Sequence, residues 1–368
     1  MQRLFSTVLV ALVVSAGAAL PQTFTLTQTF PNPTPENFDQ FGNAVAAVGN
    51  KILVGARNDD TGASNAGAVY LFDDASSAPV LTIVNPNPTP DATDDLFGSS
   101  VAGFGNDLLV GAPGANAASG EVYLFDGTTG ALLLTISNPS SSNDQFGFAV
   151  TAVGNNILVG APLNDTGATD AGIAYLFDAT GTLLRTFTNP TPLPSAGVPD
   201  QFGSSLAALG NNVLIGAPND DTGAINAGAA YLFDGNTGTL LRTFTNPSPT
   251  LSDQFGGAVA AVGSNVLIGT AFEDNPTTNS GVAYLFDVNI GSPIQTFQNP
   301  TPGNTDLFSF SVAAFGNNVL AVIGAPLDDD AGASNAGAAY LYDVSVTSPL
   351  QTFLNPAPVS GDQFGFAI

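Results

Sequence analysis

The sequence predicts an all-β protein, a β-propeller of four-stranded antiparallel blades, and three observations predict it. A unit of 49 to 56 residues repeats along the chain. Each unit contains four short apolar segments that are separated by turn residues, and the two chain ends carry complementary parts of one further unit. Four short strands at this period match a propeller blade. A linear solenoid is the alternative, but its strands do not usually follow one another as hairpins.

The unit is marked by Asp-x-Phe, which Gly follows in every copy except the one with Ser309. The copies start near residues 39, 95, 144, 200, 253 and 306, and a partial copy starts at residue 362. Their phenylalanines are Phe41, Phe97, Phe146, Phe202, Phe255, Phe308 and Phe364. The spacing predicts six complete blades and a partial seventh.

The first unit shows the expected strands. The first strand runs over Phe41–Val48, and a tight turn at Gly49-Asn50 leads to the second strand at residues 52–54. Asn beside Gly favours the positive φ of short hairpin turns. A longer polar loop precedes the third strand, Ala68–Phe72, and the fourth strand, Leu81–Val84, ends at an Asn-Pro pair that later units repeat. Proline suits the end of an outermost strand because it cannot donate a ladder hydrogen bond.

The chain ends predict a closed ring. Residues 26–30, followed by Asn32-Pro33, repeat a fourth strand, and residues 364–368 repeat the beginning of a first strand. We therefore expect the N-terminal strand to close the partial seventh blade. Since the second and third strands of that blade have no source in the sequence, we expect the natural chain to continue beyond Ile368. The alternative is a chain that fills the place by pairing with another molecule.

Composition excludes several functions. The chain has 5 Lys+Arg against 30 Asp+Glu, a net charge of −25, which disfavours nucleic acids and anionic membranes as partners. It has no Cys, His or Trp, so disulfides, thiolate metal sites and histidine chemistry are excluded. Residues 1–18 have a positive start, an apolar run and small residues, as a signal peptide does. We expect residues 19–368 to form the propeller, secreted or at the cell surface, without membrane insertion.

Acidic residues recur in the loop between the second and third strands of most units. Adjacent carboxylates with nearby carbonyls suit Ca²⁺, whereas Asp, Asn and Gly are also ordinary turn residues, so both interpretations stay open. The candidate calcium ligands are Asp59, Asp60, Asp165, Asp220, Asp221, Glu273, Asp274, Asp328, Asp329 and Asp330. We expect six of them to lie in exposed loops on one face: Asp59, Asp60, Asp220, Asp221, Asp328 and Asp329.

Other repeated residues have simpler interpretations. The Asp before each Phe is expected to make a structural hydrogen bond where the first strand begins, with a ligand role as the alternative. The Phe and Tyr residues at fixed strand positions are expected to form the core between blades. Arg57, Arg185 and Arg242 are too scattered to predict an anion site.

Phe-Gly at the start of a blade and Gly-Ala-Pro in its second strand resemble the FG-GAP repeats of the integrin α-subunit propeller, most closely the bacterial-type secreted versions. Gly-Ala-Pro stands at residues 111–113, 160–162, 216–218 and 324–326. The resemblance implies a seven-bladed ring and extracellular recognition or adhesion. The calcium loop of integrin-type repeats, between the first two strands, cannot be carried over, because most units have only Gly-Asn there and Asp107 is a lone carboxylate.

These observations favour a non-enzymatic recognition or adhesion module that presents the loops of one propeller face to an extracellular protein or glycan, with calcium as the one candidate cofactor. A structural protein of an envelope or matrix is the alternative. A propeller hydrolase or lyase is less favoured, because a catalytic site should break the repeat, while these acids recur in nearly every unit.

Overall fold

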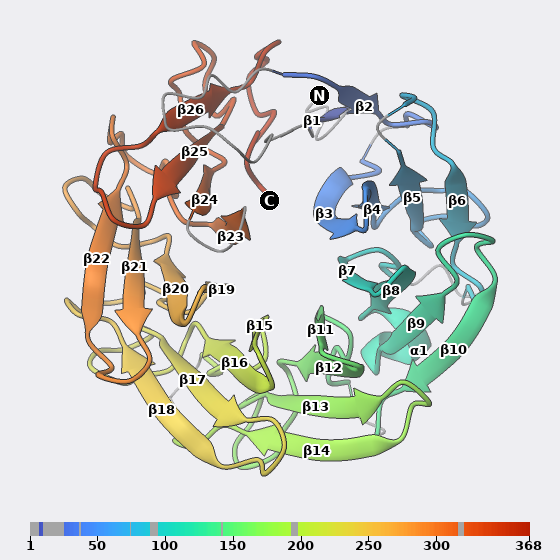
Figure 1. Cartoon of the computed structure of the whole chain (residues 1–368), viewed down its shortest axis with the longest axis horizontal. Coiled ribbons are helices and arrows are strands. Elements are labelled where there is room, and N and C mark those ends of the chain that lie inside the picture. Colours follow the sequence, from blue (N-terminus) through green and yellow to red (C-terminus); the bar gives the residue numbers. More distant parts are fainter. Residues whose placement is uncertain are drawn as a thin grey trace.

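The computed structural model describes residues 7–9, 26–36, 38–73, 75–88, 95–140, 143–192, 198–315 and 320–368. Six four-stranded antiparallel sheets stand around a common axis (Figure 1). In each sheet the chain runs outward, so that the first strand lines the axis and the fourth lies at the rim. The predicted propeller of six four-stranded blades is confirmed, and no seventh four-stranded sheet is found among the described residues.

The blades follow one another along the chain. The first consists of β3 (Phe41–Val48), β4 (Lys51–Ala56), β5 (Ala68–Phe72) and β6 (Leu81–Val84). The second consists of β7 (Ser100–Phe104), β8 (Asp107–Ala112), β9 (Glu121–Phe125) and β10 (Leu132–Ser137), with the one-turn α1 (Ala115–Ala118) between β8 and β9. The third consists of β11 (Ala149–Val153), β12 (Asn156–Ala161), β13 (Ile173–Asp178) and β14 (Leu183–Thr188).

The remaining blades have the same order. The fourth consists of β15 (Ser205–Leu209), β16 (Asn212–Ala217), β17 (Ala229–Asp234) and β18 (Leu240–Thr245). The fifth consists of β19 (Ala258–Val262), β20 (Asn265–Thr270), β21 (Val282–Asp287) and β22 (Pro293–Gln298). The sixth consists of β23 (Ser311–Phe315), β24 (Leu320–Ala325), β25 (Ala338–Asp343) and β26 (Gln351–Leu354).

A further short pair lies beside the first blade. β1 (Thr7–Leu9) pairs antiparallel with β2 (Thr29–Pro31), with Val8 opposite Phe30. β2 overlaps the segment predicted to act as a fourth strand. The predicted signal peptide, residues 1–18, lies outside the described residues except for β1, and its cleavage stays a prediction. No helix in the described ranges is long and apolar enough to cross a membrane.

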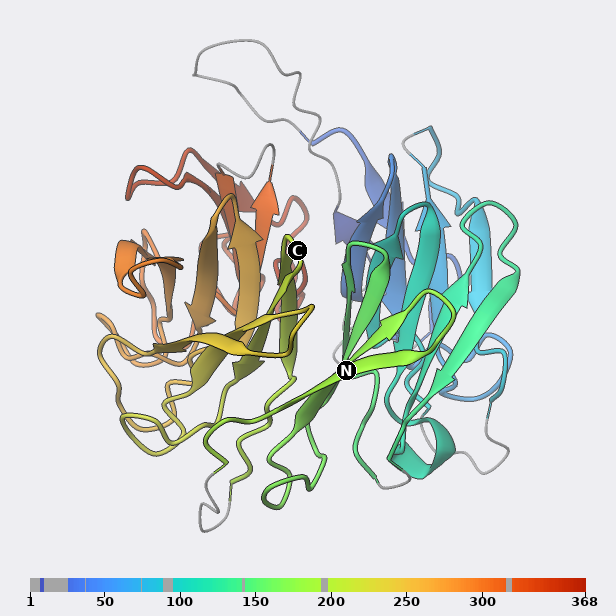
Figure 2. The ribbon, with the colours of Figure 1, turned by 60° about the horizontal axis from the view of Figure 1, so that its bottom comes forward.

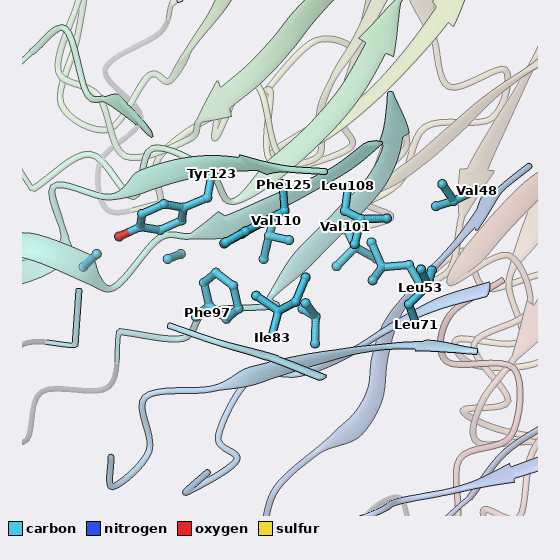
Figure 3. Close-up of a cluster of buried hydrophobic side chains, with 13 residues drawn as sticks. Val48, Leu53, Leu71, Ile83, Phe97, Val101, Leu108, Val110, Tyr123 and Phe125 are labelled. Atoms are coloured by element: carbon cyan, nitrogen blue, oxygen red, sulfur yellow. The ribbon is translucent and has the colours of Figure 1, made fainter. Parts of the chain in front are cut away.

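The core lies between the blades. In Figure 3, Leu53, Leu71 and Ile83 of the first blade face Phe97 and its neighbours in the second. The second and third strands are buried at almost every position, because each of their faces packs on a neighbouring sheet. The phenylalanines of the six complete units, Phe41, Phe97, Phe146, Phe202, Phe255 and Phe308, are all 0% exposed, as the core interpretation predicts.

Adjacent blades approach so closely that one position requires glycine. A Cβ built on Gly160, in β12, would lie 2.0 Å from the carbonyl oxygen of Gly203 in the next blade. Gly55 and Gly216 meet Gly98 and Gly256 in the same way, at 2.1 and 2.0 Å. The Gly of Gly-Ala-Pro and the Gly of Phe-Gly are therefore the two sides of one backbone contact between blades.

Three basic side chains also connect adjacent blades. Lys51 of the first blade donates to the carbonyl oxygen of Gly127, in the turn between β9 and β10, at 3.3 Å. Arg185 and Arg242 donate to the carbonyl oxygens of Asn236 and Asn289, at 3.0 and 2.8 Å, in the corresponding turns of the fourth and fifth blades. The acceptors of these three cations are thus neutral backbone carbonyls.

Candidate functional site

One face of the ring carries all the connections in which the acidic candidates lie. The 2–3 connection joins the second and third strands of a blade, and the 4–1 connection joins a fourth strand to the next first strand. Because strands alternate in direction, both kinds leave the same face, which we call the loop face. Figure 2 shows α1, in the 2–3 connection of the second blade, at the opposite end from the β9–β10 hairpin.

The first acid of each pair points into the blade. Asp59, Asp220 and Asp328 are 1%, 0% and 1% exposed. Their carboxylates accept hydrogen bonds from the hydroxyls of Tyr70, Tyr231 and Tyr340, at 2.7, 2.7 and 2.6 Å. Glu273 accepts a bond from Tyr284 at 2.7 Å in the same way. The expectation that Asp59, Asp220 and Asp328 are exposed is therefore wrong, since a buried tyrosine hydroxyl of the third strand requires this partner.

Burial changes the titration of the tyrosines and of two of the acids. It raises the pKa of Tyr70 to about 12, and it raises the pKa of Tyr231 and Tyr340 as well. Burial also raises the pKa of Glu273 and Asp328, while the bonds from their tyrosines act in the opposite direction. Because most blades have this hydrogen bond between a buried acid and the tyrosine of the third strand, it is a structural feature of the repeat.

The second acid closes its own loop. Asp60, Asp165, Asp274 and Asp329 are exposed, and Asp221 is half-buried. Each accepts a backbone N–H five or six residues later, from Asn65, Asp170, Asn226, Asn279 and Asn335, at 2.5 to 2.9 Å. Asp330 is exposed and accepts from the Thr301 hydroxyl. The expected exposure of Asp60 and Asp329 is confirmed, and the loop bond is the turn role that the sequence left as the alternative to calcium.

Two blades have other residues in place of the first acid. In the second blade, Glu121 at the start of β9 is 6% exposed and accepts from the Tyr123 hydroxyl and from Asn116. Glu121 was not among the candidate residues, and its signal in the sequence is a glutamate where the other third strands begin with Ala, Ile or Val. In the third blade, Asn164 takes the place of the first acid and donates to Asp144 at 2.7 Å.

The Asp of each Asp-x-Phe has the predicted structural role. Its carboxylate accepts from the Asn of the preceding Asn-Pro, as in Asn32 to Asp39 at 2.7 Å and Asn246 to Asp253 at 2.8 Å. The bond ties the end of a fourth strand to the next first strand. The residue between Asp and Phe has a positive φ in all seven copies, for example 54° at Gln40. The sequence did not predict this left-handed residue, which the surrounding bonds must hold in place.

The candidate calcium ligands are not gathered into a cluster. Within the described part of the chain, no group of three or more acidic, His or Cys side chains is placed to hold a metal ion. A cation at these loops would therefore need backbone carbonyls or water among its ligands. Calcium binding stays a prediction.

The axis carries a feature that the sequence analysis did not identify. The first residues of the inner strands line a pocket of about 270 Å³ that has no charged side chain in its lining. Since these residues directly follow the 4–1 connections, the pocket lies toward the loop face. Phe148 in its wall is 43% exposed, and the rings of Phe310 and Phe366 pack with centroids 4.9 Å apart. In the sequence, the aromatic lining of this pocket is marked by the residue after Phe-Gly or Phe-Ser. This residue is Phe in three units and Asn, Ser or Gly in the others.

The comparisons with known proteins agree with this geometry. The profile of the FG-GAP repeat family matches residues 35–72, 90–125, 136–177, 196–233, 248–286 and 302–342, more than half of the chain. The chain belongs to the FG-GAP repeat family. Each matched segment of this FG-GAP propeller ends at or close to the end of a third strand, so the family unit comprises the Asp-x-Phe marker and the first three strands. A comparison with curated proteins finds no match.

Arg57 lies on the loop face of the FG-GAP propeller, at the position that Pro occupies in the Gly-Ala-Pro of other units. Its guanidinium donates to the side-chain oxygen of Gln40, and burial lowers its pKa. The three arginines thus have separate partners, the Gln40 side chain for Arg57 and the carbonyl oxygens of Asn236 and Asn289 for Arg185 and Arg242.

The carboxyl of Asp306, in the 4–1 connection before the sixth blade, makes the stability of the FG-GAP propeller depend on pH. Burial, together with Asp328, Asp329 and Asp330, raises the pKa of Asp306 to about 6 from the ordinary 3.8, although the N–H of Gly303 opposes the shift. Between these two values the folded chain binds more protons than the unfolded chain. Stability therefore falls as the pH rises from about 4 to about 6, and the loss persists above that range.

We expect the melting temperature to be higher at about pH 5 than at about pH 7.5. The neutral variant Asp306→Asn should melt about 2–4 °C above the wild type at the higher pH, and it should gain less on acidification. Thermal melts of both proteins across this range test the expectation. Parallel pH profiles would show that Asp306 is not the group responsible.

Proposed function

We propose that this FG-GAP propeller is a secreted, non-enzymatic recognition or adhesion module whose loop face binds an extracellular protein or glycan. The observation that carries the proposal is the uncharged axial pocket with the exposed ring of Phe148. An exposed aromatic side chain in a concave site is the usual centre of a binding interface.

Other exposed side chains on the loop face suggest what the partner must offer. Ile225 and Leu251, on the connections of the fourth and fifth blades, are 60% and 68% exposed. They lie side by side, because the N–H of Ser252 donates to the carbonyl of Ile225 at 2.9 Å. Exposed carboxylates such as Asp60, Asp274 and Asp329 stand on the same face. A face with both exposed apolar and exposed acidic side chains suits a partner with both apolar and basic groups, or a partner bridged by calcium.

The hydrogen bonds of the repeated acids support a non-enzymatic role. In the acidic pairs the first, buried carboxylate accepts from a tyrosine hydroxyl, and the second accepts from its own loop backbone. A general acid or base must reach the proton that it transfers, whereas these buried groups face inward. The acidic pairs therefore act as scaffolding for the face that meets the partner.

We also propose that β2 and the segment 364–368 are the outer and inner parts of a seventh blade. Phe30 of β2 packs on Phe72 of the first blade, with ring centroids 4.8 Å apart. At the other end, Phe364 donates its N–H to the carbonyl of Ala336 at 2.9 Å. Both contacts have counterparts at the junctions of complete blades, which is the support for this assignment.

Arrays of purified matrix proteins and of glycans test the recognition function. We expect Phe148→Ser to lose at least about tenfold in binding to any ligand that the wild type retains, because the ring fills the centre of the interface. The matched control is Leu133→Ser, since Leu133 is 51% exposed but lies on β10 at the rim. Each array is run with calcium and with a chelator, and a calcium-dependent signal would support the acidic loops as cation sites.

Two results would contradict the proposal. Equal binding by the wild type and Phe148→Ser would place the interface elsewhere. Absence of any ligand, together with self-assembly of the purified chain, would favour the structural role in an envelope or matrix.

A further inference from the structure

The rim of the ring is formed by the fourth strands, each of which is the outermost strand of its blade. Figure 1 shows β10, β14, β18 and β22 at this rim. Within the described part of the chain, each of them pairs only with the third strand of its own blade. An outermost strand has main-chain N–H and C=O groups on its free side, and a strand of another molecule can pair with them.

The fourth strands other than β10 have features that oppose such pairing. β14 and β18 contain Arg185 and Arg242, whose charged side chains extend to the next blade. β22 begins with Pro293, and β6 and β26 have only four residues each. Charge, proline and short length all protect an edge. β10 has six residues, Leu-Leu-Leu-Thr-Ile-Ser, with neither a charged residue nor a proline, so it is the least protected edge of the described blades.

The residues of β10 are accessible and regular. Leu132 and Leu133 are 45% and 51% exposed, and Thr135 is exposed as well. A bulge lies at Leu133, as it does at the equivalent position of β14, β18 and β22. Beyond the bulge, residues 134–137 pair one to one with residues 121–124 of β9. This part of β10 therefore has the regular ladder to which a further strand can be added.

The charge of the rim indicates which partner fits it. The chain has a net charge of −25, yet none of the six fourth strands contains Asp or Glu. A basic partner would be attracted to the acidic loop connections rather than to this uncharged edge. Two copies of the chain repel each other least where neither has a carboxylate. The edge of β10 therefore suits a second copy of this chain.

We propose that β10 is a dimer interface, at which the β10 strands of two copies pair antiparallel and join two blades into one continuous sheet. A twofold axis brings identical residues together, so an uncharged edge is complementary to itself. An axis at Thr135 places the two threonines opposite each other, and threonine pairs across strands are favourable. The nearest acid along the chain, Asp126, lies in the β9–β10 turn and accepts bonds from Thr128 and Thr129. Antiparallel pairing places the two Asp126 side chains at opposite ends of the paired strands.

The direction of the strands determines how the dimer presents its loop faces. β10 runs toward the loop face, because the 4–1 connection follows its last residue. In an antiparallel pair the two rings therefore have opposite directions, and their loop faces point away from each other. A dimer of this kind can bridge two surfaces that carry the same ligand, which is a gain in valency without a new contact on the loop face. Dimerisation itself does not depend on the proposed recognition function.

The interface is small, because each copy contributes one strand at a convex rim. An interface below about 1,200 Å² is typical of weak and transient complexes. We therefore expect a dissociation constant of roughly 0.1 to 1 mM. At about 1 µM, a concentration suited to the arrays, the chain should be a monomer.

Sedimentation equilibrium of the purified chain tests the proposal. The average mass should rise from that of a monomer toward that of a dimer between about 10 µM and 1 mM. The dissociation constant should fall at least about threefold between about 0.05 and 0.5 M NaCl, because salt screens the repulsion between two acidic copies. At the highest concentration, hydrogen exchange should slow at residues 134–137 and should not change in β14.

A charge in the edge should prevent the pairing. Thr135→Lys should weaken the dimer at least about tenfold, because two ammonium groups would meet at the twofold axis. The matched control is Thr243→Lys in β18. Thr135 and Thr243 are both exposed, and they lie opposite the third-strand tyrosines Tyr123 and Tyr231. The control changes the net charge by the same amount and should associate as the wild type does.

Three results would overturn the proposal. The first is a wild type that stays monomeric at about 1 mM at both salt concentrations. The second is equal association of Thr135→Lys and Thr243→Lys. The third is a set of larger assemblies that Thr135→Lys does not prevent. The array experiment with Phe148→Ser measures the loop face of the monomer, so each proposal can fail without the other.

Discussion

Replacement of Gly160 by alanine should destabilise the propeller by about 3–5 kcal/mol, among the largest effects of any single substitution. The new methyl group would lie 2.0 Å from the carbonyl oxygen of Gly203, which belongs to the backbone of the next blade. Neither partner is a flexible side chain, so relief requires that two packed sheets move apart. Urea unfolding of the wild type and the variant measures the loss.

The matched control for this prediction is Gly257→Ala. A Cβ there has only the carbonyl oxygen of Gln254 within 4 Å, at 3.3 Å, so the expected cost is at most about 1 kcal/mol. Similar losses for the two variants would mean that alanine is costly for reasons other than the contact between blades.

Replacement of Asp220 by alanine should cost about 2–4 kcal/mol, because it leaves buried donors without an acceptor. The carboxylate is 0% exposed and accepts from the Tyr231 hydroxyl at 2.7 Å and from the N–H of Thr222 at 2.9 Å. Tyr231 is itself 0% exposed, so water cannot replace the lost acceptor without rearrangement. Thermal and urea unfolding test this expectation.

The neighbouring Asp221→Ala is the control, with an expected cost below about 1 kcal/mol, because this half-buried carboxylate closes only its own loop. If both aspartates instead act mainly as calcium ligands, the two variants should lose similar stability with calcium and little with a chelator. That outcome would contradict the structural role of Asp220.

The repeat made most of the fold predictable. The expected strands Phe41–Val48, Ala68–Phe72 and Leu81–Val84 coincide with β3, β5 and β6. They were predictable because turn residues bound each apolar segment and because six copies show the same pattern. The N-terminal segment was also assigned to a fourth strand from its likeness to residues such as Phe244, and Phe30 makes the corresponding contact.

The candidate site was predictable only in outline. Asp59 and Asp60 stand next to each other in a polar loop, yet one is buried against Tyr70 and the other is exposed. That difference depends on which side chain lies over the third-strand tyrosine, and adjacency in sequence carries no information about it. The sequence pattern did not single out Phe148, because an apolar residue near the start of a strand usually belongs to the core. Its exposure results from its place beside the axis of the ring.

The neutral partners of the basic side chains determine how ionic strength should act on the ring. Lys51, Arg185 and Arg242 donate to backbone carbonyls and Arg57 to an amide oxygen, so these contacts depend little on screening. The net charge of −25 is carried by carboxylates that repel one another. Added electrolyte weakens that repulsion, whose range falls to about 10 Å at 0.1 M and about 3 Å at 1 M. We therefore expect salt to reduce the repulsion between carboxylates while it leaves the hydrogen bonds of the basic side chains between blades almost unchanged.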